Sequence, residues 1–135
     1  MNMNGYRCVA CQLVQAADYG GFLCPACGGN LDICYDYAAA AQGMHESFAT
    51  AASDIFRFAP LLPLHQPRTA FPLRIGATPL YPVRYLKELG GMVNLYLKDE
   101  TVNPSASLKD RASAVAIGRA LDVGAGVVAV ASTGN

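Results

Sequence analysis

The sequence predicts an α/β fold that is preceded by a small metal-binding ribbon. All five cysteines lie within residues 1–34, and four of them form two Cys-x-x-Cys pairs. From residue 76 onward, apolar segments with the period of a strand flank one with the period of a helix. With 53% hydrophobic and 15% charged residues, a chain of 135 residues can bury a core around these elements. We therefore expect a ribbon at 1–34, a helical and proline-rich connector at 35–75, and an α/β segment at 76–135.

The spacing of the cysteines predicts a metal centre. Cys8-x-x-Cys11 and Cys24-x-x-Cys27 are separated by twelve residues, with glycine pairs beside the second knuckle. Such knuckles fit four thiolates around a tetrahedral ion, so we expect zinc, or iron in a rubredoxin-like site. The alternatives are two disulfides or redox-active thiols. Cys34 has no partner at knuckle spacing and is expected to be a structural or free thiol.

A site closed by four cysteines is expected to be structural, because it has no open coordination position. Nucleic-acid binding is not expected, since Arg7 is the one basic residue of the ribbon and the net charge of the chain is zero. The longest apolar run, residues 123–131, is far too short to span a bilayer. The first twenty residues do not resemble a signal peptide, so a cytoplasmic protein without a membrane partner is expected.

The connector is alanine-rich and is predicted to be helical in part. Gly43 interrupts the first helical pattern, and a second helix is expected from about Ser47 to Phe58, ended by the following proline. His45 and His65 are expected to be solvated or packing residues, because four cysteines already complete a site.

The α/β segment is predicted to alternate strands and helices. The expected helix is apolar over much of its circumference and should be largely buried. The last strand is continuously apolar, as in a parallel sheet. In order, the expected elements are a proline-broken edge strand at 78–83, a helical turn at 84–88, a strand at 93–98, a helix at 108–122 and a strand at 127–131.

One lysine falls at an unusual place. Ser107 is the expected N-cap of the long helix, and Asp110 closes a capping box, so Lys109 lies in the first turn. The positive end of the helix dipole disfavours a cation there. The amine is therefore expected to lose its proton more readily, and a neutral amine can attack a carbonyl. The alternative is a solvated lysine paired with Asp110.

Four motifs in one order carry a family resemblance. The stretch 103–111, Asn-Pro-Ser-Ala-Ser-Leu-Lys-Asp-Arg, resembles the lysine motif of the fold-type II pyridoxal-phosphate enzymes, and threonine synthases most closely. Gly-Ala-Thr-Pro-Leu at 76–80, Leu-Lys-Asp-Glu at 97–100 and Ser-Thr-Gly-Asn at 132–135 are similar to three further motifs of that family. The amino-terminal cysteines resemble those of a subset of threonine synthases.

The resemblance implies a fold, a cofactor and residue roles. The fold would be part of a three-layer parallel sheet like that of the tryptophan synthase β subunit, so that 76–135 is an incomplete catalytic domain. Pyridoxal 5'-phosphate would be the cofactor, and its electron sink would support a lyase reaction. Lys109 would bind it covalently and move protons, and Asn135 would hydrogen-bond its 3-hydroxyl oxygen. The substrate carboxylate would be held by Ser132, Thr133 and Gly134. Asp110 and Arg111 would fix the helix start through a local ion pair.

The implied reaction converts O-phosphohomoserine to threonine and phosphate. Leu108 stands where phenylalanine often precedes the family's lysine, which changes volume and not chemistry. Because the glycine-rich phosphate cradle is expected beyond Asn135, we expect an amino-terminal fragment that is inactive alone, with a homodimer as an expectation for the full-length protein. The alternatives are a related β-replacement or elimination enzyme, such as cysteate synthase or threonine dehydratase, and a zinc-ribbon interaction module fused to a catalytically dead remnant.

Overall fold

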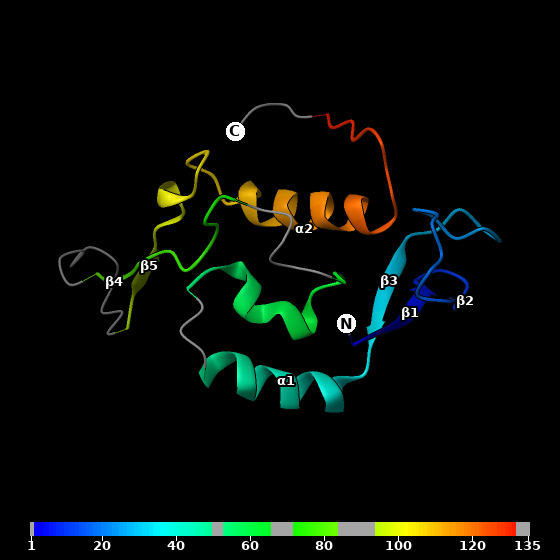
Figure 1. The fold of residues 1–135 in the computed structure, drawn as a ribbon, viewed down its shortest axis with the longest axis horizontal. Helices are drawn as coiled ribbons and strands as arrows, with labels where there is room; N and C mark the ends of the chain where they lie inside the picture. Colours follow the sequence, from blue (N-terminus) through cyan, green and yellow to red (C-terminus); the bar gives the residue numbers. More distant parts are fainter. Residues whose placement is uncertain (1, 50–52, 66–71, 84–93, 132–135) are drawn as a thin grey trace.

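The computed structural model describes residues 2–49, 53–65, 72–83 and 94–131 (Figure 1). Its first unit is a three-stranded antiparallel sheet with the strand order β2-β1-β3. Tyr6 of β1 lies opposite Gln15 of β2 and Ile33 of β3. The strands are β1 (Met3–Cys8), β2 (Val14–Gln15) and β3 (Leu31–Tyr35).

Two helical elements pack against each other after this sheet. Helix α1 (Tyr37–Ala49) runs through Gly43 without interruption, contrary to the sequence prediction. A side chain at Gly43 would meet the Pro60 ring, with the closest carbon at 3.1 Å, so the glycine serves close packing and does not end the helix. The expected helix from Ser47 to Phe58 is wrong. A separate 3-10 helix, η1 (Ile55–Leu61), begins after Asp54 and contains Pro60.

The core lies between η1 and helix α2 (Lys109–Asp122), which form neighbouring layers with α1 on the far side (Figure 1). Ala114 is completely buried in α2, and Gly118 follows one turn later. A side chain at Gly118 would lie 2.9 Å from a methyl group of Leu64, so small residues let the η1 layer approach the helix. The core residues are Ile55, Phe56, Leu64, Ile75 and Ala114.

The opposite side of α2 is open, which corrects the prediction that this helix is largely buried. Ile117 is 39% exposed and Leu121 is 57% exposed. Helix α2 ends at Asp122, as the sequence predicts. The N–H groups of Gly124 and Ala125 donate to the carbonyls of Leu121 and Ala120, which is the Schellman arrangement.

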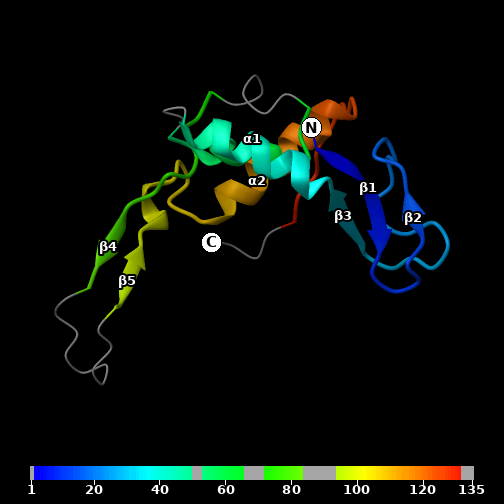
Figure 2. The same cartoon turned by 90° about the horizontal axis from the view of Figure 1, so that it is seen from below.

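The strands of the α/β segment differ from the prediction in direction and number. Strand β4 (Leu80–Pro82) pairs antiparallel with β5 (Tyr96–Lys98), and this two-stranded sheet extends away from the helices (Figure 2). Residues 127–131 form no strand, and Val127 and Val130 are 87% and 88% exposed. The described residues therefore contain no parallel sheet. The helical turn predicted at 84–88 lies outside them.

The length and composition of the helices bear on whether the chain could cross a membrane. Within the described ranges, none of the helices is long and apolar enough to cross a bilayer.

Candidate functional site

The two cysteine knuckles bring four thiols together. In each knuckle the residue after the second cysteine has a positive φ, 63° at Gln12 and 69° at Gly28, and donates its N–H to the carbonyl of the first cysteine. The same turn is therefore built twice. The sulfur atoms of the four cysteines all lie within 4.8 Å of one another; the cysteines are Cys8, Cys11, Cys24 and Cys27.

The spacing of the sulfur atoms fits a tetrahedral ion. The Cys8 and Cys27 sulfurs are 3.5 Å apart, and those of Cys11 and Cys24 are 3.6 Å apart. Four sulfurs at the usual zinc–thiolate bond length would be separated by about 3.8 Å. The cluster predicted from the spacing is thus formed, and its donor set suits zinc or iron.

Contacts within the cluster shift the pKa values of Cys8 and Cys11 in opposite directions. A hydrogen bond from the backbone N–H of Cys11 helps to lower the pKa of Cys8 to about 6. The pKa of Cys11 is raised to about 12: a backbone hydrogen bond at Leu13 lowers it, but contacts with the three other sulfurs raise it by more. Neighbouring thiolates repel one another, and a bound metal ion supplies the positive charge that offsets this repulsion. Cys34 lies in β3, opposite Gly5, outside this cluster.

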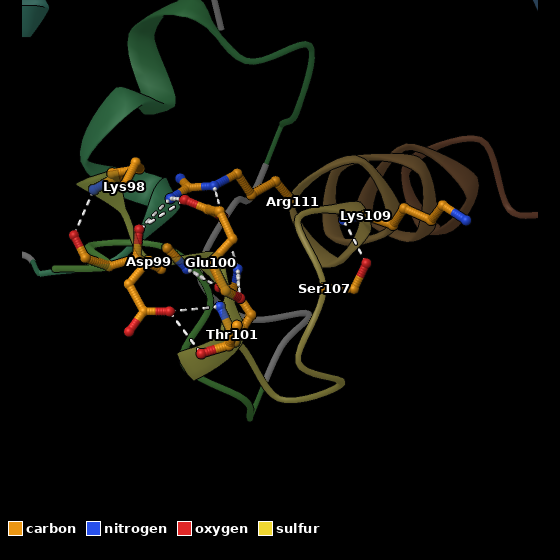
Figure 3. A network of polar contacts seen from close by, with 10 residues as sticks. Lys98, Asp99, Glu100, Thr101, Ser107, Lys109 and Arg111 are labelled. Carbon is orange, nitrogen blue, oxygen red and sulfur yellow. Dashed lines mark hydrogen bonds and ion pairs between the residues drawn. The ribbon is translucent and has the colours of Figure 1, made fainter. Parts of the chain in front are cut away.

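A second polar centre joins three of the sequence motifs. Arg111 of α2 donates from Nε to Oε2 of Glu100 at 2.8 Å and from Nη2 to Oε1 at 2.7 Å (Figure 3). The Thr78 hydroxyl donates to Oε1 of Glu100 at 2.7 Å and accepts from Arg111 at 3.1 Å. Asn103 donates to Oε2 of Glu100 at 2.8 Å and accepts the N–H of Gly76 at 3.0 Å. We call the residues Gly76, Thr78, Glu100, Asn103 and Arg111 the clamp.

The clamp corrects one prediction about the helix start. The ion pair of Arg111 is with Glu100, eleven residues earlier, and not with its neighbour Asp110. Asp110 accepts from the N–H and hydroxyl of Ser105, while the Ser107 hydroxyl accepts from the N–H of Lys109 at 3.2 Å. Leu108, and not the predicted Ser107, directly precedes α2, although the Ser107 hydroxyl still accepts the first N–H of the helix. Asp110 reaches back to Ser105, so the predicted box does not form.

Mutual contacts shift both charged groups of the clamp. Hydrogen bonds from Arg111, and then from Thr78 and Asn103, lower the pKa of Glu100 to about 2. The same pairing with Glu100 raises the pKa of Arg111. The side chain of Arg111 is 29% exposed, and that of Glu100 is 21% exposed. The pair therefore stays charged throughout the physiological pH range.

Lys109 is the first residue of α2 and is exposed. Its side chain points away from the clamp (Figure 3). The loop before it consists of small residues, and Ala106 has a positive φ of 57°, so the chain turns sharply there. The predicted cofactor and substrate residues Ser132, Thr133, Gly134 and Asn135 lie outside the described residues.

Arg119 connects the ribbon to the lysine-bearing helix. Arg119 of α2 donates from Nη2 to the Tyr6 hydroxyl and to the Ala17 carbonyl, each at 3.0 Å. A mostly apolar cavity of about 600 Å³ lies between the ribbon, the end of α2 and residues 125–130. The contacts of Arg119 with Tyr6 and Ala17 were not predicted, because no periodicity or motif relates Arg119 to residues more than one hundred positions earlier.

Thr78, Glu100 and Asn103 were also not predicted to form one polar network. All three belong to motifs that the sequence singles out, at 76–80, 97–100 and 103–111. The available signal was therefore the set of polar side chains within those motifs, although their mutual contacts depend on the fold.

Comparison with known proteins gives consistent likenesses. Residues 72–135 match the family described as "Pyridoxal-phosphate dependent enzyme". The chain is 37% identical to a threonine synthase of Methanosarcina acetivorans and 35% identical to one of Methanocaldococcus jannaschii, over 96% of its own length in both cases. A threonine synthase of Synechocystis is 38% identical over 58% of the chain.

The chain spans 31%, 32% and 21% of the lengths of these three relatives. No solved structure matches it significantly. The likeness to the two archaeal proteins covers the cysteine ribbon as well as the lysine motif, since it extends over nearly the whole chain. Residues 72–135 therefore match the pyridoxal-phosphate dependent enzyme family, and the chain as a whole is threonine synthase-like.

Proposed function

We propose that the protein carrying this sequence is a threonine synthase, a lyase that converts O-phosphohomoserine to threonine and phosphate. The observation that supports it most is the convergence of three motifs on the clamp, which leaves Lys109 exposed at the first turn of α2. The likeness to two threonine synthases over 96% of the chain supports the proposed substrate class.

The residues around Lys109 fit an anionic aldehyde cofactor. A primary amine at an exposed helix start can react with an aldehyde, and the neighbouring backbone N–H groups favour anions. The small side chains of Ser105 and Ala106 leave room for a ring close to the main chain. When bound, pyridoxal phosphate supplies the electron sink for carbanion chemistry.

Each residue of the chain then has a separate task. Lys109 holds the cofactor and carries protons to and from the α- and β-carbons of the substrate. Ser132, Thr133 and Gly134 bind the substrate carboxylate through hydroxyl and N–H groups, and Asn135 contacts the cofactor. The four cysteines hold a structural metal ion, with zinc as the proposed occupant. The domain boundaries proposed from the sequence, 1–34, 35–75 and 76–135, follow this division of tasks.

The test is a substrate panel on the protein encoded by the whole reading frame that contains these residues. We expect threonine and phosphate from O-phosphohomoserine, and loss of turnover in Lys109→Ala. The matched control is Lys98→Ala, which removes a lysine whose ammonium donates to the Thr78 carbonyl. Turnover of a different substrate in place of O-phosphohomoserine would favour cysteate synthase or a dehydratase.

The interaction-module alternative makes the opposite prediction. It requires metal binding with no covalent attachment of pyridoxal phosphate to Lys109. Mass analysis after borohydride reduction distinguishes the two, because only the enzyme proposal expects a modified peptide that contains Lys109.

A further inference from the structure

We propose that Arg111 is a positioning residue that fixes the direction in which Lys109 leaves helix α2. The inference rests on the proposed role of Lys109. It extends that role by assigning a task to a side chain that faces away from the reacting amine.

Helix geometry supplies the first step of the argument. Residues two positions apart on an α-helix differ by about 200° in direction, so Lys109 and Arg111 leave α2 on nearly opposite sides. Figure 3 shows this arrangement, with Arg111 directed into the clamp and Lys109 directed away from it. Holding Arg111 therefore sets the rotation of the first turn about its axis, and with it the direction of Lys109.

The second step is that Arg111 is held rigidly. A guanidinium with two parallel bonds to one carboxylate has a defined plane as well as a defined position. Glu100 is itself held, because it also accepts from the Thr78 hydroxyl and from Asn103. Thr78 and Asn103 are each only 5% exposed, so the partners of Glu100 belong to the packed interior.

The third step concerns the space that Arg111 occupies. A side chain at Gly76 would lie 2.9 Å from Nη1 of Arg111 and 3.1 Å from the backbone nitrogen of Ile55. Gly76 also has a φ of 82°, which side chains rarely adopt. The guanidinium thus lies against a backbone that only glycine allows to come so close.

The fourth step is that the clamp ties the first turn of α2 to distant parts of the chain. Leu108 precedes α2 and makes no capping contact through its side chain. The contacts of Ser107 with Lys109 and of Asp110 with Ser105 are local to the loop and move with it. Arg111 instead reaches Glu100, eleven residues earlier, and Thr78, thirty-three residues earlier.

The experiment uses the protein encoded by the whole reading frame that contains these residues, loaded with zinc, and compares Arg111→Met, Arg111→Lys and Glu100→Gln with the unaltered protein. Amide hydrogen exchange at residues 109–111 reports the order of the first turn. The rate at which pyridoxal phosphate is trapped on Lys109 by borohydride, measured from the mass of the peptide, reports the placement of the amine. Ile55→Val is the control, because it weakens the core without touching the side chains of the clamp.

We expect exchange at residues 109–111 to become about tenfold faster in Arg111→Met and Glu100→Gln, because a charge-assisted contact is lost. Trapping on Lys109 should become about tenfold slower, since a displaced amine reacts poorly. Arg111→Lys keeps the positive charge but loses the two parallel bonds to Glu100. Its exchange and trapping rates should therefore lie between those of Arg111→Met and those of the unaltered protein. Ile55→Val should be compared with the clamp variants under conditions where both have lost the same amount of Tm. Its exchange and trapping rates should stay within about twofold of those of the unaltered protein.

Two results would overturn the inference. One is unchanged exchange in Arg111→Met; the other is faster exchange with unchanged trapping, which would make the clamp a stabilising contact only. Absence of trapping on Lys109 in the unaltered protein would instead overturn the proposed function. The exchange data would then still decide whether Arg111 orders the first turn.

Discussion

At the scale of single residues, the clamp makes the stability of the fold depend on pH in the acidic range. The pKa of Glu100 is lowered to about 2 from an ordinary value of 4.5. A carboxyl whose pKa is depressed on folding stabilises the fold fully above its unfolded pKa and loses that contribution as the pH falls through its folded pKa. We therefore expect a loss of stability between about pH 4.5 and 2 that depends on Glu100.

The measurement is the free energy of unfolding of the original chain and of Glu100→Gln from pH 7 to pH 2. The difference between the two proteins should be largest at neutral pH and shrink toward pH 2. A difference that stays constant over this range would contradict the role of the charged pair.

A second residue-scale prediction concerns Gln12 in the first knuckle. Its φ of 63° lies in the left-handed region, where the equivalent residue of the second knuckle is Gly28. Gln12→Gly should therefore relieve strain and stabilise the zinc-loaded chain by up to about 1 kcal/mol. Gln15→Gly, which places the same change in strand β2, should be destabilising. Thermal unfolding of both variants tests the contrast.

At the scale of elements, the close contact of α2 with the η1 layer depends on Gly118. Gly118→Val should place methyl groups against Leu64 and destabilise the fold by about 1–3 kcal/mol. Ala112→Val is the matched control, since position 112 lies on the exposed side of the same helix. Urea unfolding of both variants gives the comparison, and equal losses would argue against tight packing at Gly118.

The same elements show what sequence patterns can predict. The metal cluster and helix α2 were predictable because they depend on local spacing and periodicity. Gly43 was misread because the sequence does not reveal that Pro60 lies against it. The direction of β4 and β5 was also misread. An alternating or apolar pattern gives the face of a strand but not its partner, and here the partner is an antiparallel neighbour.

The candidate site was predictable to a similar degree. Position in the chain identified Lys109 as a lysine at a helix start, and the structure agrees. The pairing of Arg111 was misassigned to Asp110, since sequence proximity does not show that an arginine can reach a carboxylate eleven residues away. Long-range contacts of this kind require the fold itself.

At the scale of the whole molecule, the ribbon and the lysine-bearing helix are joined by Arg119. Removing the metal ion, for which we propose zinc, should unfold the ribbon, because a site of four thiolates supplies much of the folding free energy of so small a unit. Amide exchange in α2 should then also become faster, since Arg119 loses Tyr6 and Ala17. In Arg119→Met, chelation should unfold the ribbon with little further effect on α2.

Hydrogen exchange with and without a chelator, followed separately in β1 and α2, provides the measurement. Restored protection after zinc is added back separates metal loss from irreversible oxidation of the thiols. Equal responses of α2 in the original chain and in Arg119→Met would contradict the connection.

The contact between Arg119 and Tyr6 also has a consequence for the order of folding. It closes a loop between residues 113 positions apart, so its entropic cost must be met before the contact can form. The ribbon closes its metal knuckles over far shorter distances in the chain and leaves the ribosome first. During synthesis, therefore, the ribbon can be complete before α2 exists, and the helix arrives at a surface that is already folded.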